Sequence, residues 1–166
     1  MSIDLLKRLG LFVVLCVVQI LVLNHIHLFN IAIPLLYIYF GITFHRNYPK
    51  WAILLWCFAL GLAIDVFSNT PGLAAGSMTL IGAIQPYLLE VFVPRDSAEG
   101  FNVSIKSMGL WKFMVFSAIL IAIFCLAFYA LEAFTFYNWI NWLIYAGSSA
   151  VLTLILIIAI ESVRAR

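Results

Sequence analysis

LWKFMVFSAILIAIFCLAFYALEAF, residues 110–134, is the stretch of sequence that decides the fold class. Its charged residues, Lys112 and Glu132, lie near its two ends. A helix rises about 1.5 Å per residue, so a run of this length covers the roughly 30 Å hydrocarbon core of a bilayer. The sequence therefore predicts a transmembrane helix here.

The rest of the chain has the same apolar character. Of its 166 residues, 66% are apolar and 10% are charged, whereas soluble domains average about 45–50% and 25%. A segment in lipid must pair its own backbone groups, which favours helices. We therefore predict an all-α polytopic membrane protein, one domain over residues 1–166 with six transmembrane helices. The predicted spans are about 8–25, 29–44, 50–67, 71–92, 110–134 and 139–160. The second and third runs are short enough for one re-entrant hairpin, but the polar residues 45–50 between them favour two spans.

The lysines and arginines indicate the orientation, because positive charge is retained in cytoplasmic loops during insertion. In the six-span arrangement all nine fall on one side, at the termini and in the second and fourth loops. They are Lys7, Arg8, Arg46, Lys50, Arg95, Lys106, Lys112, Arg164 and Arg166. Both termini are therefore predicted to be cytoplasmic.

Composition disfavours several other classes of protein. A net charge of +2 with scattered basic residues lacks the dense basic stripe of a nucleic-acid-binding protein. The cysteines, Cys16, Cys57 and Cys125, lie far apart in apolar runs, and we interpret them as buried apolar side chains. No small-residue cleavage site follows the first apolar run, so we expect it to remain as the first helix.

Metal binding and catalysis are also not expected. His25 and His27 form a His-x-His pair, but no third ligand lies near them in sequence, so neither a metal nor a cofactor is predicted. No Ser/His/Asp, Cys/His or paired-carboxylate set can be assembled at one predicted depth. The protein is therefore not predicted to be an enzyme.

Polar residues inside the predicted spans fall into two groups. The carboxylates Asp65, Glu90 and Glu132 lie near span ends, where water or a helix end can satisfy them. The polar side chains nearest the middle of the membrane are neutral: Gln19, Gln85 and the 147–149 cluster of Gly147, Ser148 and Ser149. We predict that these neutral groups form hydrogen bonds between helices. The lack of a charge at mid-membrane argues against an ion or proton relay.

GLAIDVFSNTPGLAAG, residues 61–76, is the densest local pattern and joins the third and fourth predicted helices. Thr70 can cap the fourth helix, Pro71 suits its first position, and Asp65 can reach its exposed amide groups and positive dipole end. The pattern predicts a rigid hairpin on the outer side. Whether Asp65 only stabilises the helix end or also contacts a partner stays open.

Two further features mark the fourth helix. Gly72 and Gly76 have the spacing that allows close approach of another helix backbone. Pro86 removes one helical hydrogen bond and is predicted to bend the helix.

The hairpin sequence resembles the signature of MreD, a family of rod shape-determining membrane proteins of bacteria. Chain length and span count agree with that family, and Pro86 and Tyr87 add weaker support. One position departs, because relatives often have a histidine shortly after the Pro-Gly pair, where this chain has Ala74. The residues that carry the resemblance are Gly61, Asp65, Phe67, Ser68, Asn69, Thr70, Pro71 and Gly72.

The resemblance implies a non-catalytic scaffold of the cell-elongation complex in the bacterial cytoplasmic membrane, which helps to organise peptidoglycan synthesis and cell shape. The implied partners are the transmembrane helix of MreC, MreB and the wall synthases directly or indirectly, and the lipid bilayer. The implied fold is similar to that of the six-helix substrate-binding components of energy-coupling-factor vitamin transporters. A groove between helices would then receive the MreC helix, and the resemblance also allows a homodimer.

Two rival functions remain at this point. A small-molecule (vitamin) binding component of an energy-coupling-factor transporter would have the same size and fold. Such components typically carry an Ala-x-x-x-Ala surface in the first helix, whereas this chain has no alanine before Ala32. A small membrane enzyme acting on lipid or wall precursors is the second rival, and substitution of Asp65 and Glu132 would test it.

Overall fold

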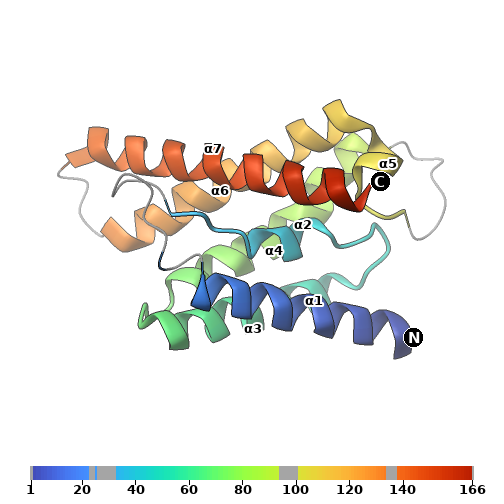
Figure 1. The fold of residues 1–166 in the computed structure, drawn as a ribbon, viewed down its shortest axis with the longest axis horizontal. Coiled ribbons are helices and arrows are strands. Elements are labelled where there is room, and N and C mark those ends of the chain that lie inside the picture. The colour runs from blue at the N-terminus through green and yellow to red at the C-terminus, as the bar shows by residue number, and fades with distance from the viewer. Residues whose placement is uncertain (1, 23–24, 26–32, 94–100, 134–137, 166) are drawn as a thin grey trace.

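The computed structural model describes residues 2–22, 25, 33–93, 101–133 and 138–165, and these residues contain helices and connecting segments without a strand. Figure 1 shows the long helices side by side, roughly along the longest axis, with both ends of the chain at the same end of the molecule. The all-α prediction is confirmed for this part of the chain. The helices are α1 (Ser2–Leu21), α2 (Ile38–Ile42), α3 (Lys50–Ser68), α4 (Leu73–Phe92), α5 (Ile105–Met108), α6 (Leu110–Ala133) and α7 (Trp139–Arg164).

Among the described residues, three helices, α3, α6 and α7, are long and apolar enough to cross a membrane. Their outward faces carry exposed apolar side chains, among them Val66, Leu126 and Val151. Large exposed apolar surfaces are rare on soluble proteins and typical of membrane interaction. These helices indicate a membrane protein.

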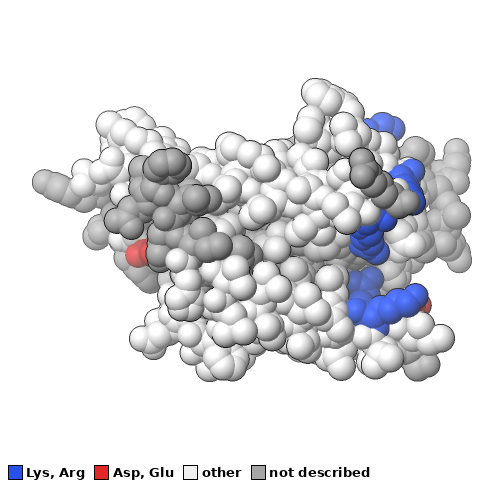
Figure 2. Space-filling view, in the orientation of Figure 1, with Lys and Arg blue, Asp and Glu red and all other residues white. Residues whose placement is uncertain are grey.

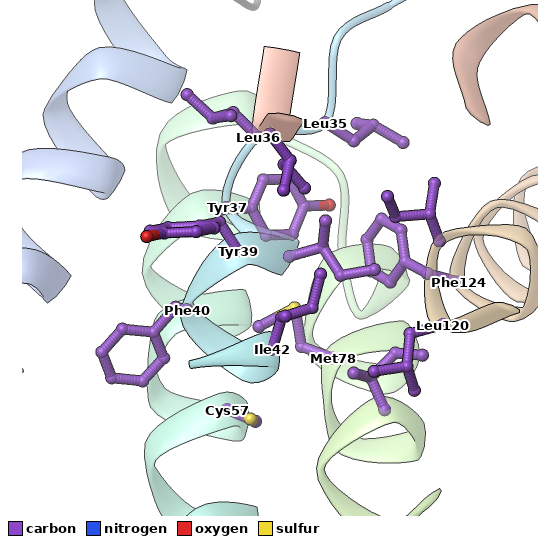
Figure 3. Packing of buried hydrophobic residues seen from close by; sticks show 14 of the residues in the cluster. Leu35, Leu36, Tyr37, Tyr39, Phe40, Ile42, Cys57, Met78, Leu120 and Phe124 are labelled. Carbon is purple, nitrogen blue, oxygen red and sulfur yellow. The ribbon is translucent and has the colours of Figure 1, made fainter. Parts of the chain in front are cut away.

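The centre of the core is the short helix α2. All five of its residues are buried, and Ile38, Phe40 and Ile42 have no exposed surface. Figure 3 shows this turn of helix among side chains from α3, α4 and α6, including those of Cys57 and Phe124. The preceding residue, Tyr37, packs edge to face on Phe124 with ring centroids 5.4 Å apart.

The cysteines confirm their predicted role as buried apolar side chains. Cys16, Cys57 and Cys125 are all buried and free. Cys57 lies against Gly82 of α4, where an added Cβ would come within 3.2 Å of the Cys57 sulfur. Thiols at these positions fill space between helices.

The predicted continuous helix over 29–44 is wrong for its described part, residues 33–44. Residues 33–35 are not helical, and α2 is only five residues long. Pro34 accounts for the break, because proline has no N–H to donate and disfavours the helical conformation in the residue before it, Ile33. The apolar run alone favours a continuous helix, and Pro34 interrupts it.

Side chains of α1 and α7 pair the backbone that this break exposes. Ser149 Oγ accepts from the Ile33 N–H at 3.2 Å, and Thr153 Oγ1 accepts from the Leu35 N–H at 3.1 Å. Gln19 both accepts from the Leu36 N–H and donates to the Pro34 carbonyl, each at 3.0 Å. Irregular backbone at membrane depth is tolerated only where it is buried in protein in this way.

The predicted hydrogen bonds between helices are therefore confirmed in part. Gln19 and Ser149 bond to the 33–36 segment, and Gln85 Nε2 donates to the Phe44 carbonyl at 3.0 Å. Ser148 instead bonds to carbonyls of its own helix, at Ile144 and Tyr145.

The chain from 33 to 45 runs beside α7 in the same direction. Ile33 meets Ser149, Leu35 meets Thr153, and Tyr39 then meets Glu161, a residue near the end of α7. His45 reaches Arg8, near the start of α1. This segment therefore follows α7 from Ser149 to Glu161, near the end of that helix, although α2 is short.

The predicted loop between the spans 71–92 and 110–134 contains a short helix, α5, which the sequence analysis did not predict. Ser104 caps α5 by accepting from the Ser107 N–H, and Val103 and Met108 are buried. The Phe101 carbonyl accepts from the Arg46 N–H at 3.3 Å. The described part of this connection packs on the bundle, while residues 94–100, including Arg95, lie outside the described residues.

Candidate functional site

Asp65 joins α3 to the start of α4. It is 4% exposed, and its Oδ1 accepts from the Ala74 N–H at 2.9 Å and from the Thr70 hydroxyl at 3.0 Å. Its Oδ2 accepts from the Ala75 N–H at 2.8 Å. The first amides of a helix have no partner within the helix and lie at its positive end, so a carboxylate is well suited to them. The prediction that Asp65 reaches these amides is confirmed.

The predicted roles of Thr70 and Pro71 are wrong. The helix begins at Leu73, and its N-cap residue is Gly72, which has no side chain to make a capping bond. Pro71 precedes the helix, and Thr70 donates its hydroxyl to Asp65. The carboxylate from α3 already occupies the amides that Thr70 was expected to cap, and it does so with a full charge.

Two left-handed residues shape the turn between α3 and α4. Asn69 has φ 55° and ends α3, and Gly72 has φ 83° immediately before α4. Glycine reaches this region without strain, and asparagine tolerates it better than most residues. The Thr70 N–H donates to the Asp65 carbonyl at 3.1 Å, which pairs the end of α3. The hairpin is closed by its own backbone and by one carboxylate.

The close approach of α3 and α4 is at Gly61. A Cβ added there would lie 2.5 Å from the Ala75 Cα, closer than real Cβ contacts allow. Within the described residues, Gly72 and Gly76 do not provide the predicted approach of a helix backbone. Gly72 precedes the helix beside open space, and a Cβ added at Gly76 would lie 3.2 Å from the Leu131 side chain. The glycine spacing was visible in the sequence, but the partner of each glycine was not.

A pocket of about 370 Å³ lies beside the hairpin. Phe67, Ser68 and Thr70 of the hairpin border it, and Phe67 is 69% exposed. Tyr37 also borders it, with a buried hydroxyl that has no hydrogen-bond partner in the part of the chain that the structure describes. The remaining lining residues are Ile20, His25, Ile33, Leu35, Ile64, Ala74, Phe128 and Glu132.

His25, Ser68 and Glu132 border this one pocket, a proximity that the sequence reading did not expect. No group of three or more His, Cys, Asp or Glu residues in the described ranges could hold a metal. His27 lies outside those ranges. The prediction of a non-enzymatic protein stays a prediction.

Pro86 is buried inside α4, which continues to Phe92. The bend expected at Pro86 stays a prediction. The neighbouring Tyr87 is exposed, and Lys50 Nζ lies 4.1 Å from the centroid of its ring. Glu90, the other carboxylate of α4, is exposed.

Basic residues mark the opposite end of the bundle, which we call the basic end and define by Lys7, Arg8 and Arg164. Figure 2 shows lysine and arginine side chains gathered at one end of the visible face. Figure 1 places the start of α1 and the end of α7 at that same end. The basic residues at 95 and 166 lie outside the described residues.

Glu161 forms a buried cluster at the basic end that the sequence reading missed. It is 1% exposed and accepts from the Tyr39 hydroxyl. Arg164 Nη1 donates to that hydroxyl at 3.0 Å and lies 3.9 Å from the Glu161 carboxylate. The i,i+3 spacing of Glu161 and Arg164 could have indicated the ion pair. No sequence signal links either residue to Tyr39.

Arg8 holds a second cluster at the basic end. Its guanidinium lies 4.4 Å from the ring centroids of both Phe44 and Tyr48, and its Nη2 is 2.9 Å from His45 Nδ1. A guanidinium can only donate, so His45 Nδ1 must be the acceptor. Burial lowers the pKa of His45 below its usual 6.5, and the positive charge of Arg8 lowers it further. His45 is therefore neutral at pH 7.

Comparison of the chain with protein-family models, curated proteins and solved structures finds no match in any of the three.

Proposed function

We propose that this protein is a non-catalytic scaffold of the bacterial cell-elongation complex, of the MreD type, in the cytoplasmic membrane. Its role would be to bind the transmembrane helix of MreC and so help to organise peptidoglycan synthesis. MreB and the wall synthases would associate directly or through MreC. The proposal starts from the resemblance of the hairpin sequence and is supported by how that hairpin is built.

The observation that carries the proposal is that the hairpin pattern contains two kinds of residue: some stabilise the turn, and one is exposed beside the pocket. Gly61, Asp65 and Gly72 serve the turn itself, through close packing, capping and backbone conformation. Phe67 does not: it is 69% exposed and borders the adjacent pocket. Aromatic side chains, including phenylalanine, are enriched in the cores of protein interfaces. We therefore assign Phe67 to partner binding and Asp65 to its support.

The proposed topology has six crossings with both termini in the cytoplasm. α1, the segment 33–44, α3, α4, α6 and α7 would alternate in direction, and the segment 33–44 would cross largely as irregular backbone buried in protein. Positive charge at the basic end supports the orientation, because cytoplasmic loops retain lysine and arginine. A homodimer would use the exposed face of α7, where Gly147 borders open space.

The experiment is affinity purification of the tagged full-length protein from native membranes in mild detergent, with mass spectrometry of the proteins that accompany it. We expect MreC or the wall synthases with the wild type, and their loss with Phe67→Ala. Val91→Ala is the matched control, because Val91 is also a highly exposed apolar residue and lies at the other end of α4. Retention of the same partners by Phe67→Ala would remove the assignment of Phe67. Recovery of energy-coupling ATPase subunits would overturn the scaffold proposal.

The second candidate is a small-molecule binding component of an energy-coupling-factor transporter. One observation favours it: the pocket beside the hairpin has the size of a small-ligand site, and it is bordered by the Tyr37 hydroxyl, which has no hydrogen-bond partner among the described residues. Mass spectrometry of small molecules released from the purified protein tests this function. A stoichiometric ligand that is lost in Tyr37→Phe would favour it over the scaffold.

A further inference from the structure

A second pocket, of about 590 Å³, opens at the basic end. α1 contributes Lys7, Arg8 and Leu11 to its lining, and α7 contributes Ile160 and Arg164. Figure 2 shows lysine and arginine atoms on both sides of a hollow at this end. The volume lies within the roughly 300–1,000 Å³ of small-molecule sites.

The charge of this pocket favours an anion. Three cations, Lys7, Arg8 and Arg164, line it, against the one lining carboxylate of Asp4. The Glu161 carboxylate does not line the pocket; it is buried and already engaged by Tyr39 and Arg164. Burial and Arg8 lower the pKa of His45, so this lining residue adds no charge at pH 7.

The two guanidinium groups are held in place by contacts that leave further donors. Arg8 is fixed by two aromatic rings and by His45, and Arg164 is fixed by the Tyr39 hydroxyl. Each guanidinium has five N–H donors, and these contacts use one donor of each. Arginine donors in a planar fork match the oxygens of a phosphate group.

The same pocket also has an apolar side. Leu11 and Ile160 line it, and α7 continues beyond them with exposed apolar side chains such as Ile155 and Val163. A free phosphate ion would not bury this apolar surface, whereas the acyl chains of a lipid would cover it. Charge and apolar surface together therefore fit a molecule with an anionic head and apolar tails.

We propose that this pocket binds the phosphate headgroup of an anionic phospholipid between α1 and α7, with the acyl chains along the outer face of α7. Clusters of lysine and arginine beside membrane helices commonly recognise anionic headgroups. The bound lipid would hold the first and last long helices together at this end. The binding itself does not depend on the proposed scaffold function.

Native mass spectrometry of the full-length protein in detergent tests the proposal. Phosphatidylglycerol is titrated against phosphatidylcholine with the same acyl chains, and inorganic phosphate is added separately at millimolar concentration. We expect phosphatidylglycerol to bind more tightly than phosphatidylcholine and to stay bound when phosphate is added. Equal binding of the two lipids would overturn the proposal. Displacement by phosphate would overturn the lipid in favour of a free-anion site.

Variants of exposed residues sharpen the test without endangering the fold. Lys7→Gln should weaken phosphatidylglycerol binding roughly fivefold, as expected for one basic residue at a lipid surface. Asp4→Asn should strengthen it by a similar factor, a gain that misfolding cannot imitate. Lys112→Gln is the matched control, because it removes the same charge from α6 outside the lining of the pocket. Equal losses in Lys7→Gln and Lys112→Gln, or no gain in Asp4→Asn, would refute the site.

Discussion

Replacing Asp65 by asparagine keeps the size of the side chain and removes one acceptor and the charge. Asp65 Oδ1 and Oδ2 each accept from a backbone N–H at the start of α4, at 2.9 and 2.8 Å. An amide has one oxygen, so its NH₂ group would face the Ala74 or Ala75 N–H, donor against donor. One buried amide group of α4 would be left without a partner.

The expected loss of stability follows from these two changes. A hydrogen bond to a charged group contributes about 1.5–3 kcal/mol, and a negative charge at a helix N-terminus about 0.3–1 kcal/mol. Removing a buried charge also relieves its desolvation, which offsets part of this loss. We therefore expect Asp65→Asn to lower the free energy of unfolding by about 2–3 kcal/mol, within the range of a lost cap plus an unpaired buried donor. Thr70→Val removes one neutral donor to Asp65 and should cost about 1 kcal/mol.

The assay is reversible unfolding of the purified protein in mixed detergent micelles with increasing dodecyl sulfate, followed by far-ultraviolet circular dichroism. Glu90→Gln is the control, because Glu90 is an exposed carboxylate on the same α4 helix and should change stability by less than about 0.5 kcal/mol. If Asp65→Asn is as stable as Glu90→Gln, the carboxylate does not hold the hairpin and the reasoning fails. If it is destabilised but still purifies with its partners, Asp65 serves the fold alone.

Three further perturbations have definite expected results in the same unfolding assay. Gly61→Ala should destabilise by about 1–3 kcal/mol or more, because its Cβ would lie 2.5 Å from the Ala75 Cα and the two helix backbones must separate. Gln19→Leu should cost about 2–4 kcal/mol, because it leaves the Leu36 N–H and a carbonyl buried and unpaired. The lowered pKa of His45 makes the neutral form the one that stabilises the fold. Stability from His45 should be complete above its ordinary pKa of 6.5 and decline as pH falls through the lower folded pKa.

Each of these predictions has its own control. Gly147→Ala places a methyl group in open space on α7 and should leave stability unchanged or slightly higher. Equal effects at Gly61 and Gly147 would mean that the helices do not touch at Gly61. For Gln19→Leu the comparison is Thr153→Val, which removes the acceptor for the Leu35 N–H in the same segment and should also destabilise the protein. His45→Gln keeps an acceptor for Arg8 but cannot titrate, so a pH dependence that survives in this variant must come from another group.

Sequence reasoning predicted elements and contacts that depend on local pattern. The long helices follow from apolar runs that continue for a bilayer thickness, and the interaction of Asp65 with α4 follows from a short turn that returns the chain to the same depth. The inter-helix bonds of Gln19 and Ser149 could be predicted in kind, because polar side chains in lipid must find partners. Their actual partners, backbone amides of a broken segment, could not be.

The errors share a physical cause. Hydropathy alone does not distinguish a helix, whose backbone groups bond to each other, from an irregular segment whose backbone groups bond to neighbouring side chains. The apolar run 29–44 therefore predicts a helix that is absent over residues 33–35. Its position just before α4 favours Thr70 as the capping residue. The first amides of α4 instead donate to Asp65, a stronger acceptor that comes from α3 across the turn. The Tyr39 contact with Glu161 joins residues 122 positions apart, and no local pattern encodes it.

The non-helical segment around Pro34 cannot complete its hydrogen bonds until later parts of the chain have been synthesised. Ile33 finds its hydrogen-bond partner 116 residues later in the chain, at Ser149. At a synthesis rate of about 5–20 residues per second, the ribosome needs roughly 6–23 s to supply that partner. During this interval the amide at Ile33 must be hydrated or held by the insertion machinery. Arrival of the last helix, α7, is therefore the step that completes the hydrogen bonding of this segment.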